Sequence, residues 1–205
     1  MGRLKKNKKK NRRSKSKSLI NIVAGVDEAG RGSLIGPVYA AAVILNKSIN
    51  KKNLKDSKSL SKKRREKICL YIKKNSIWAI GKASIKEIES INILNASLLA
   101  MQRAIKKLKK KPKLTLIDGN KLPELKNYHL RYVIKGYQKI PCISAASILA
   151  KVSRDKFVNN LSKKFKHYKW NSNFGYGTKE HLKAIKKFGI TKHHRKKFSP
   201  ISSYK

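Results

Sequence analysis

Two of the ten acidic residues lie where a carboxylate could do chemistry. The 205 residues include 53 Lys and Arg but only 10 Asp and Glu, so each acid can be considered singly. Asp27 follows the apolar run 22–26, Asp118 follows the apolar run 114–117, and each precedes a small or Gly-containing turn. Such runs are typical of buried strands that end in a turn. A carboxylate at that place is costly to desolvate unless a cation or several hydrogen-bond donors compensate it.

Converging carboxylates of this kind would hold a divalent metal ion. If the two predicted strands are neighbours, Asp27 and the adjacent Glu28 meet Asp118. Mg²⁺ takes oxygen ligands and keeps water and substrate phosphate in its shell. Two such ions roughly 3.5 to 4 Å apart can activate a water and stabilise the leaving oxygen in phosphodiester hydrolysis. Each Asp could instead cap a turn or a helix N-terminus, and the spacing leaves both uses open.

The tripeptide Gly30-Arg31-Gly32 directly follows this first pair of acids and a single alanine. Glycine lets the backbone approach a ligand closely, and a guanidinium can hold a phosphate. Facing a nucleic acid, such a turn would offer donors to the ribose 2′-hydroxyl, the group that distinguishes RNA from DNA. Gly-rich turns are also common in structural loops, so the tripeptide by itself is weak evidence.

Four polar residues recur along the helical pattern 144–165. They are spaced by three, four and four positions, which puts them on one helix face: Ser144, Ser147, Lys151 and Asp155. This face is either a surface with an ordinary ion pair between Lys151 and Asp155, or it lies under the acid cluster. Spacing cannot decide between the two. The five histidines show no metal-ligand spacing.

The formal net charge of +43 favours a polyanionic partner. A general drift of composition toward lysine would charge any solvated surface as well, so this charge gives affinity for phosphate without selectivity. Cys69 and Cys142 belong to no metal-ligand or CxxC spacing, which disfavours a disulfide framework. No run reaches the length of a membrane span, and the N-terminus lacks an apolar signal core. We therefore expect a soluble, cytoplasmic protein with no membrane association.

The remaining pattern predicts one α/β domain with appendages. Residues 1–18 carry ten Lys or Arg and no acid, which predicts a disordered basic arm, either a nucleic-acid tether or a tail without a role. The domain is expected over 19–190, followed by a loose basic tail over 191–205. Apolar runs and helical periodicity predict the elements of a mixed sheet with helices. Strands are expected over 19–26, 38–45, 77–84, 114–117 and either 132–134 or 140–143, and helices over 61–74, 94–110, 144–165 and 178–188.

Five short segments occur in one order along the chain. They are VDEAGRG from Val26 to Gly32, Asp56-Ser57-Lys58 with Leu60, Asp118-Gly119-Asn120, SAASILAKVSRD from Ser144 to Asp155, and Gly175-Tyr176-Gly177-Thr178. Together they resemble the signature of the ribonuclease HII family and span about residues 22–182. The resemblance implies a ribonuclease H-like fold, with a mixed five-stranded sheet flanked by helices and a helical C-terminal part.

The same resemblance implies an endonuclease that uses Mg²⁺ or Mn²⁺ and acts as a monomer. It would hydrolyse the RNA strand of RNA/DNA hybrids and cut 5′ to ribonucleotides embedded in duplex DNA, leaving 5′-phosphate and 3′-hydroxyl ends. The implied metal ligands are Asp27, Glu28 and Asp118. The implied contacts with the nucleic acid are Gly30, Arg31, Gly32, Lys58 and Tyr176. Four helix residues would support the site: Ser144, Ser147, Lys151 and, behind the others, Asp155.

Within these implied roles, each contact has its own task. Gly30, Arg31 and Gly32 would surround the 2′-hydroxyl of the ribonucleotide. Tyr176 would stack on the sugar at the junction of RNA and DNA, and Lys58 would steady a phosphate.

One segment departs from the family pattern. The family usually places a fourth carboxylate in a Lys-Gly-Asp segment shortly before SAAS, and here that segment ends in Tyr137. A phenol, which ionises near pH 10, is a poor metal ligand. Either substrate phosphate supplies the missing oxygen at a higher metal demand, or a nearby acid such as Asp155 or Glu124 substitutes. The rival interpretation is a catalytically impaired relative that binds hybrids without cutting them.

Overall fold

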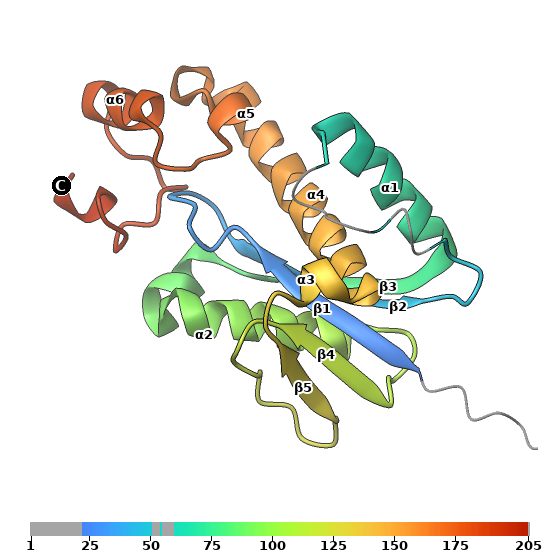
Figure 1. The fold of residues 1–205 in the computed structure, drawn as a ribbon. Coiled ribbons are helices and arrows are strands. Elements are labelled where there is room, and N and C mark those ends of the chain that lie inside the picture. Colours follow the sequence, from blue (N-terminus) through green and yellow to red (C-terminus); the bar gives the residue numbers. More distant parts are fainter. Residues whose placement is uncertain (1–21, 51–53, 55–59, 205) are drawn as a thin grey trace, which may run out of the picture.

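The computed structural model describes residues 22–50, 54 and 60–204, and at its centre is a five-stranded sheet. The strand order is β3-β2-β1-β4-β5 (Figure 1). The strands are β1 (Val23–Ala29), β2 (Val38–Leu45), β3 (Ser76–Ala83), β4 (Leu114–Asp118) and β5 (Leu130–Val133). β2 is antiparallel to β1 and β3, whereas β4 is parallel to β1 and β5. The mixed sheet predicted from the sequence is therefore confirmed.

Helices cover both faces of this sheet (Figure 1). One face carries α2 (Ile85–Lys106), and the other carries α1 (Lys62–Asn75) and α4 (Pro141–Lys164). The short α3 (Gly136–Lys139) precedes α4 directly. This three-layer arrangement agrees with the expected α/β class.

The side chains of β2 alternate between the two cores, as a strand with both faces covered requires. Ala40 and Ala42 belong to the core shared with α2, whereas Ala41 and Val43 belong to the core shared with α1 and α4. A Cβ at Gly25 of β1 would overlap the backbone at the start of α4. Glycine there lets this helix lie directly against the central strand.

Two of the predicted elements need correction. The pattern 94–110 predicted only the second half of α2, because the helix is interrupted at Asn92, which has a φ of 64°. The side chain of Asn92 accepts a hydrogen bond from Asn95 N at 3.1 Å and so caps the second half. The alternative fifth strand at 140–143 is also wrong, because these residues begin α4 with Pro141 in its first turn.

The C-terminal part forms a small core of its own. It contains the 3-10 helix η2 (Lys166–Tyr168), α5 (Trp170–Asn173), α6 (Lys179–Phe188) and the 3-10 helix η3 (Ile201–Ser203). In the described part of this region the end of the chain is not loose, contrary to expectation. Arg195 and Ile201 are fully buried, and His194 forms a β-bridge with Ile35. The basic composition of this segment predicted a solvated tail, but the side chain of Arg195 points into the protein.

Some expectations fall on residues outside the described part. These are the basic arm at 1–18 and the Asp56-Ser57-Lys58 element. Within the described residues, no helix is long and apolar enough to cross a membrane.

Candidate active site

The acid cluster is created by the pairing of β1 with β4. These strands are parallel neighbours, with Val26 opposite Ile117, so Asp27 and Asp118 come next to each other one residue further on. Asp27 lies opposite Ala41, which faces α4, and therefore shares that face of the sheet. Glu28, the next residue of β1, lines the same pocket as Asp27 and Asp118. β1 continues to Ala29, so Asp27 and Glu28 lie within the strand rather than after it.

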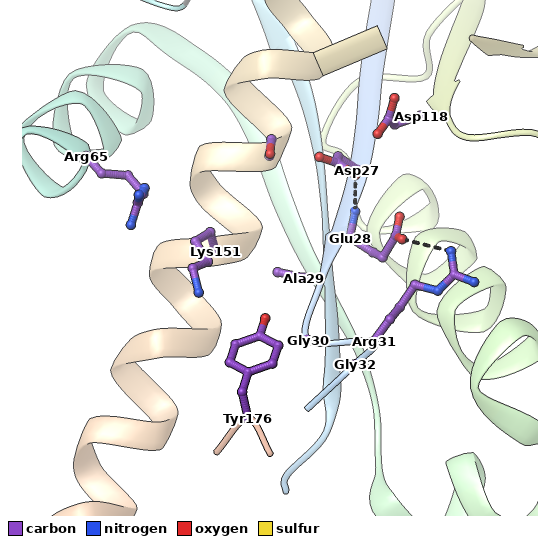
Figure 2. Close-up of a pocket in the computed structure, with 11 residues that line it drawn as sticks. Asp27, Glu28, Ala29, Gly30, Arg31, Gly32, Arg65, Asp118, Lys151 and Tyr176 are labelled. Atoms are coloured by element: carbon purple, nitrogen blue, oxygen red, sulfur yellow. Dashed lines mark hydrogen bonds and ion pairs between the residues drawn. The ribbon is translucent and has the colours of Figure 1, made fainter. Parts of the chain in front are cut away.

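Each of the three carboxylates is held by a local donor. Glu28 N donates to Asp27 Oδ1 at 2.7 Å, and Gly136 N donates to Asp118 Oδ1 at 2.7 Å. Arg31 Nη1 donates to Glu28 Oε1 at 3.3 Å (Figure 2). The acids are thus oriented before any ligand binds.

The electrostatics of the cluster favour a cation. Burial raises the pKa of Asp27 well above its ordinary value, and the charges of Glu28 and Asp118 raise it further, while a hydrogen bond from Ser147 opposes the shift. Burial also raises the pKa of Glu28, partly offset by Arg31. Repulsion among carboxylates in a poorly solvated place is relieved when a positive ion binds.

The donor set fits an open metal site. Among the described residues, no group of three or more Asp, Glu, His or Cys side chains is arranged to hold a metal ion by itself. Carboxylate oxygens beside an open pocket nevertheless suit Mg²⁺ or Mn²⁺, because such ions leave several positions to water and substrate phosphate. Asp27, Glu28 and Asp118 would hold the ion on one side only.

A pocket of about 420 Å³ opens over the acids. Figure 2 shows that it lies between β1 and α4, with the ring of Tyr176 on the side away from Asp27 and Asp118. It is lined by Asp27, Glu28, Ala29, Gly30, Arg31, Gly32, Arg65, Asp118, Ser147, Lys151 and Tyr176. Chain segments far apart in the sequence, at 27–32, 118, 147–151 and 176, therefore meet in one place.

The polar helix face is not a solvated surface, because Ser144, Ser147 and Asp155 are buried, although the expected ion pair is present. Lys151 Nζ lies 3.0 Å from Asp155 Oδ1, the ordinary ion pair, yet Ser147 and Lys151 also line the pocket. Ser144 donates from its hydroxyl to the carbonyl oxygen of Tyr137 and does not line the pocket. Asp155 is held by Lys151 and by Arg154, whose Nη1 lies at 3.2 Å. It is therefore turned away from the acids.

No described side chain takes the place of the fourth acid in this pocket. Tyr137 lies in α3, next to the residue whose N–H holds Asp118, but it does not line the pocket. Neither does Asp155 or Glu124, and the backbone carbonyl of Glu124 accepts from Gln102 of α2, which lies on the other face of the sheet. The structure thus lends no support to substitution by either acid.

Tyr176 is placed by its neighbours rather than by a regular element. It follows Gly175, whose φ of 71° brings its backbone against the side chain of Ile35. The ring centroid lies 5.0 Å from the Arg154 guanidinium and 5.6 Å from Lys151 Nζ. These cations support the ring beside the Gly30–Gly32 turn, with its hydroxyl pointing into the pocket (Figure 2).

Sequence reasoning missed three arginines around this site. Arg65 of α1 lines the pocket directly. Arg154 is 1% exposed, and its Nη2 donates to Ser33 Oγ at 2.6 Å. Arg195 donates to the carbonyl oxygens of Gly30, Arg31 and Gly36. The only signal in the sequence was the use of arginine in a lysine-rich chain. A planar guanidinium can donate to several acceptors at once, so arginine indicates positions where such contacts are needed.

The chain is similar to known proteins over most of its length. The family model described as "Ribonuclease HII" matches residues 24–201. The ribonuclease HII of Pelagibacter ubique (strain HTCC1062) is 76% identical over 183 residues, which cover 89% of this chain and 98% of that protein.

Solved structures show the same fold. The ribonuclease H2 of Pyrococcus horikoshii OT3 superposes with a TM-score of 0.74 at 26% identity, covering 88% of this chain and 95% of that one. Bst-RNase HIII, solved in complex with Mn²⁺, gives a TM-score of 0.68 at 17% identity over 88% of this chain and 68% of that one, a likeness of fold alone. From the match to the family model and the identity to its relatives, this chain belongs to the ribonuclease HII family of endoribonucleases.

Proposed function

We propose that the protein hydrolyses the RNA strand of RNA/DNA hybrids and cuts 5′ to ribonucleotides embedded in duplex DNA, with Mg²⁺ or Mn²⁺. The observation that carries the proposal is the single pocket shared by Asp27, Glu28 and Asp118 with the Gly30–Gly32 turn and Tyr176. Acids suited to phosphodiester hydrolysis thus lie beside a backbone turn that can read a 2′-hydroxyl.

Each pocket residue has a task in this mechanism. Asp27, Glu28 and Asp118 would hold the metal ions, which, when bound, activate the attacking water and stabilise the leaving 3′-oxygen. The turn would donate backbone N–H groups to the ribose, and the ring of Tyr176 would pack on the neighbouring sugar. The products would carry 5′-phosphate and 3′-hydroxyl ends.

Two cations of the pocket suit the scissile phosphate. Lys151 reaches the pocket from α4, and Arg65 reaches it from α1 on the far side of that helix (Figure 2). Lys151 forms an ion pair with Asp155, and this pair fixes the direction of the lysine side chain. A cation held in this way can orient a phosphate without losing much side-chain freedom on binding.

The metal requirement is also part of the proposal. Bst-RNase HIII, a protein of the same fold, was solved in complex with Mn²⁺, which supports a requirement for a divalent metal ion. With no fourth acid in the pocket, we expect the second ion to depend on the substrate phosphate for part of its shell. The proposal also includes a cytoplasmic monomer that removes RNA primers and misincorporated ribonucleotides.

Cleavage of a labelled duplex with one central ribonucleotide tests the function directly. All-DNA and all-RNA duplexes serve as controls, and each is incubated over a series of Mg²⁺ and Mn²⁺ concentrations with the protein and with Asp27→Asn. We expect one cut, 5′ to the ribonucleotide, that disappears in Asp27→Asn. Binding without metal-dependent cutting would contradict the proposal and support the impaired, hybrid-binding relative.

A further inference from the structure

Three hollows of the surface adjoin one another, because neighbouring hollows share lining residues. The catalytic pocket and a hollow of about 380 Å³ between α1 and α4 share Arg65. That second hollow shares Lys62 and Asn159 with a third, of about 680 Å³, where α4 ends. We call the second and third hollows together the α1–α4 furrow. It connects the acids with η2 and α5 of the C-terminal part.

The far end of the furrow, which is the third hollow, is lined by several lysines and by no acidic residue. Its lining residues are Lys62, Asn159, Ser162, Lys163, Lys166, Lys169, Asn171 and Ser172. In the middle section the acids are Glu66 and Asp155, and Asp155 is already paired with Lys151 and Arg154. Lysines of a solvated face normally spread apart, whereas these converge on a concavity beside amides and hydroxyls. Convergent like charges raise the local potential and attract a polyanion.

One aromatic ring joins this end to the catalytic pocket. Lys62 Nζ lies 5.8 Å, and Lys151 Nζ 5.2 Å, from the centroid of Phe174. Lys62 belongs to the far end and Lys151 to the catalytic pocket. The two cationic sections therefore meet at Phe174, where a phosphate backbone could pass from Lys151 of the catalytic pocket to Lys62 of the far end.

The length of α4 sets how far the furrow reaches. Lys151 lies in the catalytic pocket and Lys163 in the last turn of the same helix, so a rise of about 1.5 Å per residue separates them by about 18 Å. A duplex advances by about 3.4 Å per base pair, which makes this roughly five base pairs.

We propose that the α1–α4 furrow binds the sugar–phosphate backbone of the substrate duplex on one side of the cleaved position, roughly five base pairs away. Lys163, Lys166 and Lys169 are the phosphate contacts. This inference rests on the proposed function for its substrate. Such contacts carry no sequence information; they fix the position of the duplex and make its affinity depend on salt.

The test compares two triple variants with equal loss of charge. Lys163→Gln/Lys166→Gln/Lys169→Gln removes the far end of the furrow. Lys106→Gln/Lys107→Gln/Lys109→Gln removes three exposed lysines at the end of α2 and just beyond it, on the other face of the sheet. Thermal unfolding followed by circular dichroism checks that both variants fold. Binding is measured by fluorescence anisotropy in EDTA, where no cleavage occurs.

Three duplexes make the test specific for distance. One has about twelve base pairs on each side of a central ribonucleotide, and the others are cut to about three base pairs on the left or on the right. We expect the furrow variant to bind the long duplex about tenfold more weakly than the control variant does. The slope of log K against log[salt] should be shallower by up to about 2.7, the value for three phosphate contacts. The duplex that is shortened on the side of the furrow should bind the unmodified protein more weakly than the long duplex does. The furrow substitutions should not weaken the binding of this shortened duplex any further.

Two results would overturn the inference. Equal affinity of the furrow and control variants for the long duplex would show that only total charge matters. If the furrow substitutions weakened the binding of both truncated duplexes as much as that of the long duplex, the lysines would contact the substrate nearer to the cleaved position. Because binding is measured without cleavage, a protein that binds in this way but never cuts would contradict the proposed function and leave the furrow supported.

Discussion

Arg195 Nη2 donates a hydrogen bond of 2.8 Å to the carbonyl oxygen of Gly30, although 165 positions separate the two residues. The same guanidinium donates to the carbonyl of Arg31 at 2.8 Å and to that of Gly36 at 2.9 Å. Arg195 is fully buried. Burial, with the nearby charge of Arg154, lowers its pKa to about 9, so it remains charged at neutral pH. The C-terminal segment thus fixes the Gly30–Gly32 turn beside the acids of the candidate site.

This relationship predicts that Arg195→Lys lowers kcat/KM for a single embedded ribonucleotide about 10- to 100-fold. Lysine keeps the charge but cannot serve three carbonyls in fixed directions. As a matched control, Lys192→Arg changes a neighbouring basic residue outside this network. Steady-state kinetics at temperatures well below each unfolding midpoint separate the effect from stability. Equal kinetics in both variants would show that the turn holds its shape without Arg195.

Tyr137→Asp should lower the metal concentration that gives half-maximal rate, by about tenfold. The backbone of this segment is already tied to Asp118 through Gly136 N, so a carboxylate at position 137 would add a negative charge near the acids that would hold the metal ions. Cleavage rates over a Mg²⁺ series measure this concentration. Tyr137→Phe is the matched control, because it removes only the hydroxyl. An unchanged metal requirement in Tyr137→Asp would count against a weakly held second ion.

Asp155→Asn should destabilise the fold while leaving the metal requirement unchanged. Asp155 accepts from Arg154, which is 1% exposed, so losing its charge leaves a buried guanidinium partly uncompensated. The expected cost is about 2 to 4 kcal/mol in the free energy of unfolding. Urea unfolding measures the cost, and rates over a Mg²⁺ series measure the requirement. A requirement that rises severalfold would instead make Asp155 the substitute for the missing acid.

The C-terminal core should lose stability as the pH falls from about 6.5 toward 4. Trp170 Nε1 donates to His181 Nε2 at 2.8 Å, and Thr191 N donates to His194 Nδ1 at 2.9 Å, so both imidazoles are neutral acceptors. Burial lowers the pKa of His181, and burial with the charge of His181 lowers that of His194 to about 4.

The sign follows from where protons bind. An unfolded histidine takes up its proton near pH 6.5, whereas folded His194 does so only near 4. Stability is therefore fully present above about pH 6.5 and falls by up to roughly 3 kcal/mol toward pH 4. Urea unfolding at pH 7.5 and pH 5 measures the loss. This loss of stability should be smaller in His194→Gln but unchanged in His129→Gln, which replaces an exposed histidine. An equal loss of stability in both variants would refute the assignment to His194.

The amino-acid sequence by itself singled out two acids of the candidate site and predicted most of the elements. Asp27 and Asp118 could be singled out because acids are rare and both adjoin apolar β-branched runs, a local pattern. Local patterns of apolar residues also predicted the strands β2 and β4 and the helices α1, α4 and α6. The first half of α2 was missed, although Ser84 and Glu87 form a capping box that the sequence displays.

Only the tertiary structure decided which distant residues act together. That β1 lies beside β4, so that Asp27 meets Asp118, depends on sheet order, which local periodicity does not encode. The role of Arg195 depends on the same kind of information. In a chain with 53 Lys and Arg residues, nothing in the local sequence distinguishes a guanidinium in solvent from one that holds the Gly30–Gly32 turn. The difference arises from burial and from the direction of three carbonyls, and both are set by the packing of the whole chain.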